Sequence, residues 1–274
     1  MSEAELEQKR QALLNPGQTV DDLLAAELRV SYPTLAALRT PRPVAASKSS
    51  ANAFNGFSRP TPATPVAEFD DDTLDTTAVL FKRYCSVRNI TAAASPHTVF
   101  YTCLFVALKI EEQRLTVEEL VAKLSALHDR RVPVPPAVAA DIILGEPKLL
   151  AALRFHLHVF HPLTALRGHL SCVFPSASTP PPSAPVFILK EESAFDHVLV
   201  LAPSLRAVAA LVRFHNQTHD DDNPIFDAVH RYLKSPRFLD ACGISSLSDP
   251  KFAALVSLSA RLHARAQRLA PELF

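Results

Sequence analysis

The stretch AVLFKRYCSVRNITAAASPHTVFYTCLFVALKIEEQ, residues 78–113, decides the fold of this chain. From position 97 to position 110, apolar side chains cover the whole circumference of the expected helix. Such a helix lies in the middle of a bundle or in a membrane, and this one is too short for a bilayer, which needs about 20 apolar residues. It ends in Lys109, beside Glu111 and Glu112. The stretch therefore predicts the central helix of an all-α domain, with a charged tip that is available to a partner.

Length and composition indicate a globular protein of about two domains. The chain has 274 residues, of which 48% are apolar, and a domain typically takes about 150 residues. The first residues lack an apolar core of the kind found in signal peptides, and the four cysteines are scattered, so we expect a reduced, intracellular protein. The 28 basic residues equal the 28 acidic ones, which argues against a dedicated nucleic-acid binder. With five glycines the chain carries no phosphate-binding loop motif.

Proline-rich and polar stretches divide the chain into segments. We expect N-terminal helices in residues 1–39, a flexible insertion in 40–72, a first helical bundle in 73–172, a linker in 173–190, and a second bundle with a C-terminal helix in 191–274. The insertion and the linker are rich in Pro, Ser and Ala and lack helical periodicity. These boundaries predict two helical bundles in tandem.

Within the bundles, periodicity and capping signals predict the individual helices. We expect helices over 73–86, 97–111 and 117–127, and a helix that restarts at Gly145 with Pro147 in its first turn. Residues 186–189 are the only plausible strand.

Three Thr-Pro pairs lie in the expected insertion. They begin at Thr40, Thr61 and Thr64 and predict sites for a proline-directed kinase. A solvated loop without a regulatory role explains the same pattern equally well.

Two quoted stretches resemble a known family. Residues 78–112 resemble the second and third helices of a cyclin box, and GEPKLLAALRFHLHVFHPLTALRGHL, residues 145–170, resembles the fifth helix and its exit. The phrase LRFHLHVFHP is most similar to cyclin H and the transcriptional group of cyclins C, K, L and T. The resemblance implies two tandem cyclin-box five-helix bundles with extra N- and C-terminal helices. It also implies a regulatory subunit without catalysis of its own, which binds and activates a cyclin-dependent kinase. The expected location is the nucleus and the expected process is transcription or the activation of other kinases. The expected assembly is a heterodimer with the kinase, which a third assembly factor or a transcription complex can join.

The resemblance assigns the kinase-binding residues. Lys109, which ends the third helix, and Glu146, near the start of the fifth, match the lysine and glutamate that bond the main chain of the kinase's C helix in cyclins. Neighbouring apolar residues would line the groove: Val106, Ile110, Leu150, Phe155 and Leu157. No catalytic residue, cofactor or metal is implied. The chain lacks tryptophan and the docking patch of cell-cycle cyclins, so we expect substrates that need no R-x-L motif.

Other interpretations remain open on the sequence alone. Lys109 and Glu146 could be ordinary solvated charges at helix ends. A transcription-factor-IIB-like protein shares the cyclin-box fold but binds promoter DNA, and the neutral net charge counts against it. A helical enzyme or scaffold unrelated to cyclins is the third alternative. The histidines His156, His158 and His161 alternate like metal ligands on a strand, but we expect them at a helix end, where they face different ways.

Overall fold

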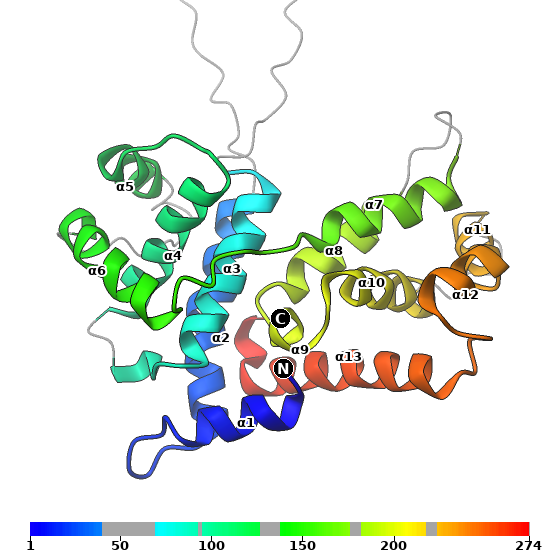
Figure 1. Cartoon of the computed structure of the whole chain (residues 1–274), viewed down its shortest axis with the longest axis horizontal. Helices are drawn as coiled ribbons and strands as arrows, with labels where there is room; N and C mark the ends of the chain where they lie inside the picture. The colour runs from blue at the N-terminus through cyan, green and yellow to red at the C-terminus, as the bar shows by residue number, and fades with distance from the viewer. Residues whose placement is uncertain (40–68, 93–94, 127–137, 176–181, 218–223, 274) are drawn as a thin grey trace, which may run out of the picture.

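The structure is a computed structural model that describes residues 1–39, 69–92, 95–126, 138–175, 182–217 and 224–273. All regular structure in these ranges is helical, which confirms the all-α class (Figure 1). The helices are α1 (Glu3–Gln11), α2 (Val20–Arg39), α3 (Asp71–Cys85), α4 (Pro96–Ile110), α5 (Val117–Ala126), α6 (Val138–Ala152), α7 (Pro162–Val173), α8 (Ala184–Glu192), α9 (His197–Val200), α10 (Pro203–Gln217), α11 (Pro224–Leu233), α12 (Pro236–Cys242) and α13 (Pro250–Leu269), with short 3-10 turns at Ile90–Ala92 and Pro271–Leu273.

The helices form two groups, each around its own apolar core. Helices α2 to α6 lie on one side of the molecule and α7, α8 and α10 to α12 on the other, while α13 runs beneath the second group and ends beside α2 (Figure 1). One buried cluster draws its side chains chiefly from α2 to α6, and the other from α7, α8 and α10 to α13. The tandem arrangement predicted from composition is therefore present.

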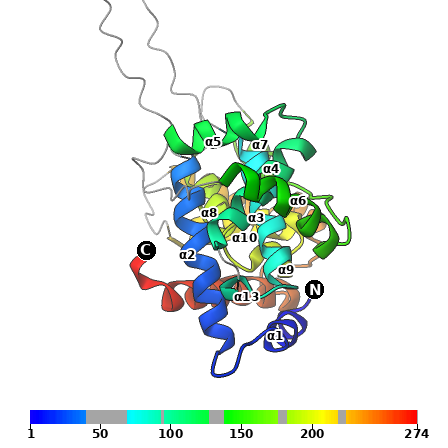
Figure 2. The ribbon, with the colours of Figure 1, turned by 90° about the vertical axis from the view of Figure 1, so that its left-hand side faces the viewer.

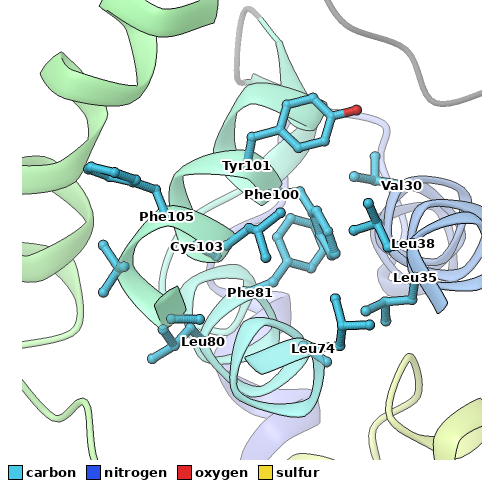
Figure 3. Close-up of a cluster of buried hydrophobic side chains, with 14 of the residues drawn as sticks. Val30, Leu35, Leu38, Leu74, Leu80, Phe81, Phe100, Tyr101, Cys103 and Phe105 are labelled. Atoms are coloured by element: carbon cyan, nitrogen blue, oxygen red, sulfur yellow. The ribbon is translucent and has the colours of Figure 1, made fainter. Parts of the chain in front are cut away.

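Helix α4 is the centre of the first core, as the sequence predicts. Ser95 caps its N-terminus by accepting a hydrogen bond from the N–H of Thr98, and Pro96 occupies the first turn, where no donor is lost. Every residue from Phe100 to Leu108 is buried. Figure 3 shows Phe100 of α4 packed between Phe81 of α3 and the leucines of α2, and the Phe81 and Phe100 rings meet edge to face at 5.2 Å.

The predicted limits of the first bundle, 73 and 172, do not coincide with this core. Helix α2 was expected outside it, yet its Leu23, Leu35 and Leu38 lie in the first core with no more than 1% exposure. Helix α7 was expected inside it, but Leu166 packs in the second core. Each helix is amphipathic, and an amphipathic pattern shows that one face is covered without showing which bundle covers it.

The second core surrounds helix α10. Ala207, Ala210 and Leu211 are fully buried there. Helix α12 ends at Gly243, which adopts a left-handed φ of 64° and lets the N–H of Ile244 donate to the carbonyl of Leu239. Glycine suits this position because a side chain would strain the left-handed turn.

The terminal helices connect the two groups. Along α13, Phe252 packs in the second core while Ala266 packs in the first. Arg265 of α13 forms ion pairs with Glu7 of α1, at 3.0 Å, and with Asp21 of α2, at 2.8 Å. Figure 2 shows α13 crossing behind α2 with α1 alongside. Extra terminal helices that pack on the first bundle, expected from the resemblance, are therefore present.

A buried network of four charges ties α1 to α2, to α3 and to Asp196, which directly precedes α9. Arg10 of α1 donates to both carboxylate oxygens of Asp196, at 2.6 and 2.9 Å, and to Glu27 of α2, at 2.8 Å. Lys82 of α3 donates to Glu27 at 2.9 Å and lies 3.4 Å from Asp196. Burial alone would raise the pKa of Asp196, but the Arg10 and Lys82 cations hold it well below its usual range. The two cations and two carboxylates compensate each other away from water.

Two further expectations need correction. Residues 186–189, the possible strand, belong to α8, so the predicted linker 173–190 is partly helical. The expected insertion 40–72 ends earlier than predicted, because Asp70 caps α3 by accepting from the N–H of Thr73. Residues 40–68, with all three Thr-Pro pairs, lie outside the described residues. Among the described helices, none is both long enough and apolar enough to cross a membrane.

Candidate functional site

The end of α4 places Lys109 at the surface of the first bundle. The helix closes with Glu112 in a left-handed conformation, φ 57°, while the N–H of Gln113 donates to the carbonyl of Leu108 at 2.8 Å. This is the hydrogen-bond pattern of a Schellman motif, which ends a helix abruptly. Lys109 therefore leaves the last turn of a helix that is otherwise buried, and its side chain is half exposed.

Lys109 and Glu146 meet directly. The ammonium of Lys109 lies 2.6 Å from Oε1 of Glu146 and 4.3 Å from the centre of the Phe105 ring. Figure 3 shows Phe105 pointing from α4 toward α6, on the side of the core away from α2. The structure thus brings together the two residues that the sequence selected 37 positions apart.

Glu146 lies within a continuous helix and not at the start of one. The sequence predicted a new helix from Gly145 with Pro147 in its first turn, but α6 runs unbroken from Val138 to Ala152. Pro147 has no backbone N–H, so the carbonyl of Ile143 lacks the helical hydrogen bond that it would otherwise accept from position 147. Gly145 allows α6 to approach α4, because a Cβ at this position would lie 2.9 Å from Oγ1 of Thr102.

An exposed apolar stripe flanks the ion pair on α6. Ile143 and Leu150 lie three residues before and four residues after Glu146, and therefore on the same side of the helix. Ile143 is 52% exposed and Leu150 is half-buried. We call Lys109, Ile143, Glu146 and Leu150 the Lys109–Glu146 face. Ile143 was not among the residues predicted from the sequence, although its spacing from Glu146 and Leu150 could have indicated it.

The remaining predicted groove residues lie in different environments. Val106 is only 3% exposed and packs in the first core, so its side chain is covered in this structure. Ile110 and Leu157 are partly buried and pack against the same core. Phe155 is 70% exposed. It lies beyond the end of α6, whereas the sequence placed it within the helix.

The histidines of the LRFHLHVFHP phrase do not assemble a site. His158 packs edge to face against Phe160, with ring centres 4.4 Å apart, and His161 faces carboxylates of α3 and Glu111 instead. The side chain of Asp75 is the main cause that raises the pKa of His161. Across the described residues, no group of three or more His, Cys, Asp or Glu side chains could hold a metal ion.

Part of the chain that holds this ion pair matches a known family. Residues 64–158 match the family model described as cyclin, N-terminal domain. This match contains α3 to α6 and both members of the ion pair. The match confirms the resemblance to cyclins over this part of the sequence. No curated protein sequence matches the chain.

Two solved structures have the same fold over most of their length. A chain of the yeast TFIIK (Kin28/Ccl1/Tfb3) complex is 16% identical, with a TM-score of 0.59 over 96% of this chain and 94% of that chain. A chain of the Chaetomium thermophilum CAK complex bound to ATP-gamma-S is 19% identical, with a TM-score of 0.56 over 98% of this chain and 78% of that chain. At these identities the likeness concerns the fold, and it extends through the second group of helices.

Proposed function

We propose that this protein is a regulatory cyclin subunit, without catalysis of its own, that binds and activates a cyclin-dependent kinase. The Lys109–Glu146 pair carries the proposal. It lies at the surface within the region that matches the cyclin N-terminal domain, and the sequence resemblance assigns these two residues to the bonding of a kinase's C helix. The two structural neighbours support it, since both belong to multi-subunit complexes, TFIIK (Kin28/Ccl1/Tfb3) and CAK.

The pair can bind a partner's main chain without breaking. An ammonium has three donors, and Lys109 uses one of them on Oε1 of Glu146. The other two can donate to carbonyls at the end of the kinase's C helix, where the helix dipole is negative. Oε2 of Glu146 remains an acceptor for an N–H. Because one charge neutralises the other, the face becomes buried without leaving an unpaired ion.

The apolar residues of the face would supply most of the binding energy. Ile143 and Leu150 are available on α6, and Phe155 follows at its end. Aromatic and aliphatic anchors in a desolvated centre usually dominate an interface. Holding the C helix in place assembles the kinase's catalytic Lys–Glu pair and its metal-binding loop, which is how such a partner activates the enzyme.

We further propose a nuclear role in transcription, close to cyclin H. The resemblance of the LRFHLHVFHP phrase and the names of the two neighbouring complexes support this role. The TFIIK name gives three components, which is compatible with a third assembly factor beside the kinase. Substrates would then be the heptad repeats of the RNA polymerase II tail or the activation loop of another kinase.

Reconstitution with a panel of cyclin-dependent kinase catalytic subunits tests the proposal. We expect one or a few of them to bind this chain stably and to phosphorylate a tail heptad peptide only in its presence. The complex should not phosphorylate substrates that carry an R-x-L motif in preference to substrates without one. Activity confined to R-x-L substrates would contradict the transcriptional role. Binding to promoter DNA that weakens steeply with salt, with no kinase bound, would favour the transcription-factor-IIB-like alternative instead.

A further inference from the structure

We propose that Arg83 is a positioning residue, which fixes the loop after α6 so that Phe155 projects toward the kinase. This inference rests on the proposed function and adds a residue that the motif match did not assign. Arg83 belongs to α3 and contacts neither Lys109 nor Glu146 by any hydrogen bond or ion pair among the described residues. Its effect on a partner would therefore pass through the loop.

The loop has a backbone that its residues do not favour. Arg154 and Phe155 both adopt left-handed conformations, with φ of 49° and 58°. The N–H of Phe155 donates to the carbonyl of Leu150 at 3.0 Å, and the N–H of Arg154 donates to that of Ala151 at 3.1 Å. This is a Schellman motif whose left-handed position, usually taken by glycine, holds an arginine. Consecutive left-handed residues other than glycine persist only where the surroundings fix them, and they are typical of functional sites.

The left-handed turn leaves the ring of Phe155 exposed. In a Schellman motif the apolar residue at this position usually packs back on the helix. Here the phenyl ring is 70% exposed. An exposed aromatic ring on a strained turn fits an anchor that a partner covers better than a residue that stabilises the free protein.

Arg83 supplies the external hold on the loop. Its Nη1 donates to the carbonyl of His156 at 2.9 Å and to the carbonyl of His158 at 3.1 Å. These carbonyls lie one and three residues beyond Phe155, so the guanidinium fixes the chain directly after the left-handed pair. Hydrogen bonds from a charged donor are stronger than neutral ones. Because α3 is part of the first core, this contact ties the loop to the most rigid part of the bundle.

A double-mutant cycle on kinase binding tests the proposal. The variants are R83A, F155A and R83A/F155A. The control is R88A, because Arg88 is an exposed arginine five residues further along the chain, outside the predicted kinase-binding surface. We expect F155A to weaken binding about thirtyfold, a hot-spot effect, R83A to weaken it about tenfold, and R88A to leave it unchanged. The double variant should bind like F155A alone, since Arg83 acts through Phe155.

A backbone variant adds a second readout. Glycine in place of Arg154 removes the cost of the left-handed turn, so R83A/R154G should regain part of the affinity lost in R83A. Unchanged binding by R83A overturns the proposal, and so do R83A and F155A effects that simply multiply, because a general loss of stability would weaken binding equally in both backgrounds. If K109A/E146A loses binding while R83A and F155A do not, only this inference fails. If the unaltered protein binds no kinase, the proposed function fails and this inference with it.

Discussion

Replacing Arg10 by methionine should unfold this protein far more readily than any surface change on the same helix. Methionine keeps the unbranched stem of the side chain and removes the charge and the donors. Arg10 is fully buried and supplies three hydrogen bonds to Asp196 and Glu27. Without it, two buried carboxylates share Lys82 as their only cation in the network.

The expected loss follows from the burial of these charges. Removing one partner from a buried ionic network costs about 3–5 kcal/mol, because the remaining charges stay desolvated and uncompensated. A protein of this size has roughly 5–15 kcal/mol of stability in total. At about 2–4 °C per kcal/mol, the melting temperature should fall by roughly 10 °C.

The assay is urea and thermal unfolding at pH 7, followed by helical circular dichroism, for the unaltered protein, R10M and K9M. Lys9 precedes Arg10 on α1 and is exposed, so K9M removes the same charge without disturbing the network. We expect K9M to lie within about 0.5 kcal/mol of the unaltered protein, as most surface substitutions do. A loss in R10M below about 1 kcal/mol would refute the reasoning that this network holds α1 in place against α2 and the start of α9.

Further substitutions test the packing of α6 and the buried histidine of α9. G145A should cost about 1–3 kcal/mol by forcing α6 away from Thr102, whereas G168A, with nothing within 4 Å of its Cβ in α7, should be neutral or stabilising; equal effects in thermal melts would contradict this. Burial, aided by Arg206, lowers the pKa of His197 to about 3, so the unfolded state binds the proton more readily and stability falls as pH drops below about 6.5. From pH 6.5 to pH 5 the unaltered protein should lose about 2 kcal/mol more of its free energy of unfolding than H197N does. The same pH dependence of urea unfolding in both proteins would disprove this contribution of His197.

Much of the fold was predictable because its signals are local. The all-round apolar pattern of residues 97–110 marks a central helix whatever its neighbours are, and the structure places α4 there. Ser95 and Pro96 determine its start by capping chemistry that acts within one turn. The motif match selected Lys109 and Glu146, and the structure brings them to 2.6 Å. Lys109 could be recognised from the sequence because a single charged residue directly follows a run of apolar ones.

The errors concern information that is not local. The sequence could not show that α2 packs in the first core and α7 in the second, since amphipathic periodicity does not identify the partner. Pro147 suggested a helix start, but α6 continues through it, and Gly145 in the preceding turn packs closely against Thr102 of α4. The exposure of Phe155 depends on a left-handed turn that an Arg-Phe pair does not signal.

The affinity of the reconstituted kinase for the K109A/E146A variant tests the central claim most directly. The matched control is R29A/E272A, which removes an exposed ion pair of 3.0 Å from another surface. Truncating a charge pair that becomes buried in an interface costs about 2–5 kcal/mol per partner. We therefore predict that K109A/E146A binds about a thousandfold more weakly in calorimetric titration, with helical circular dichroism intact, and that R29A/E272A binds like the unaltered protein. Equal affinities for all three proteins would contradict the assignment of the Lys109–Glu146 face as the kinase-binding surface.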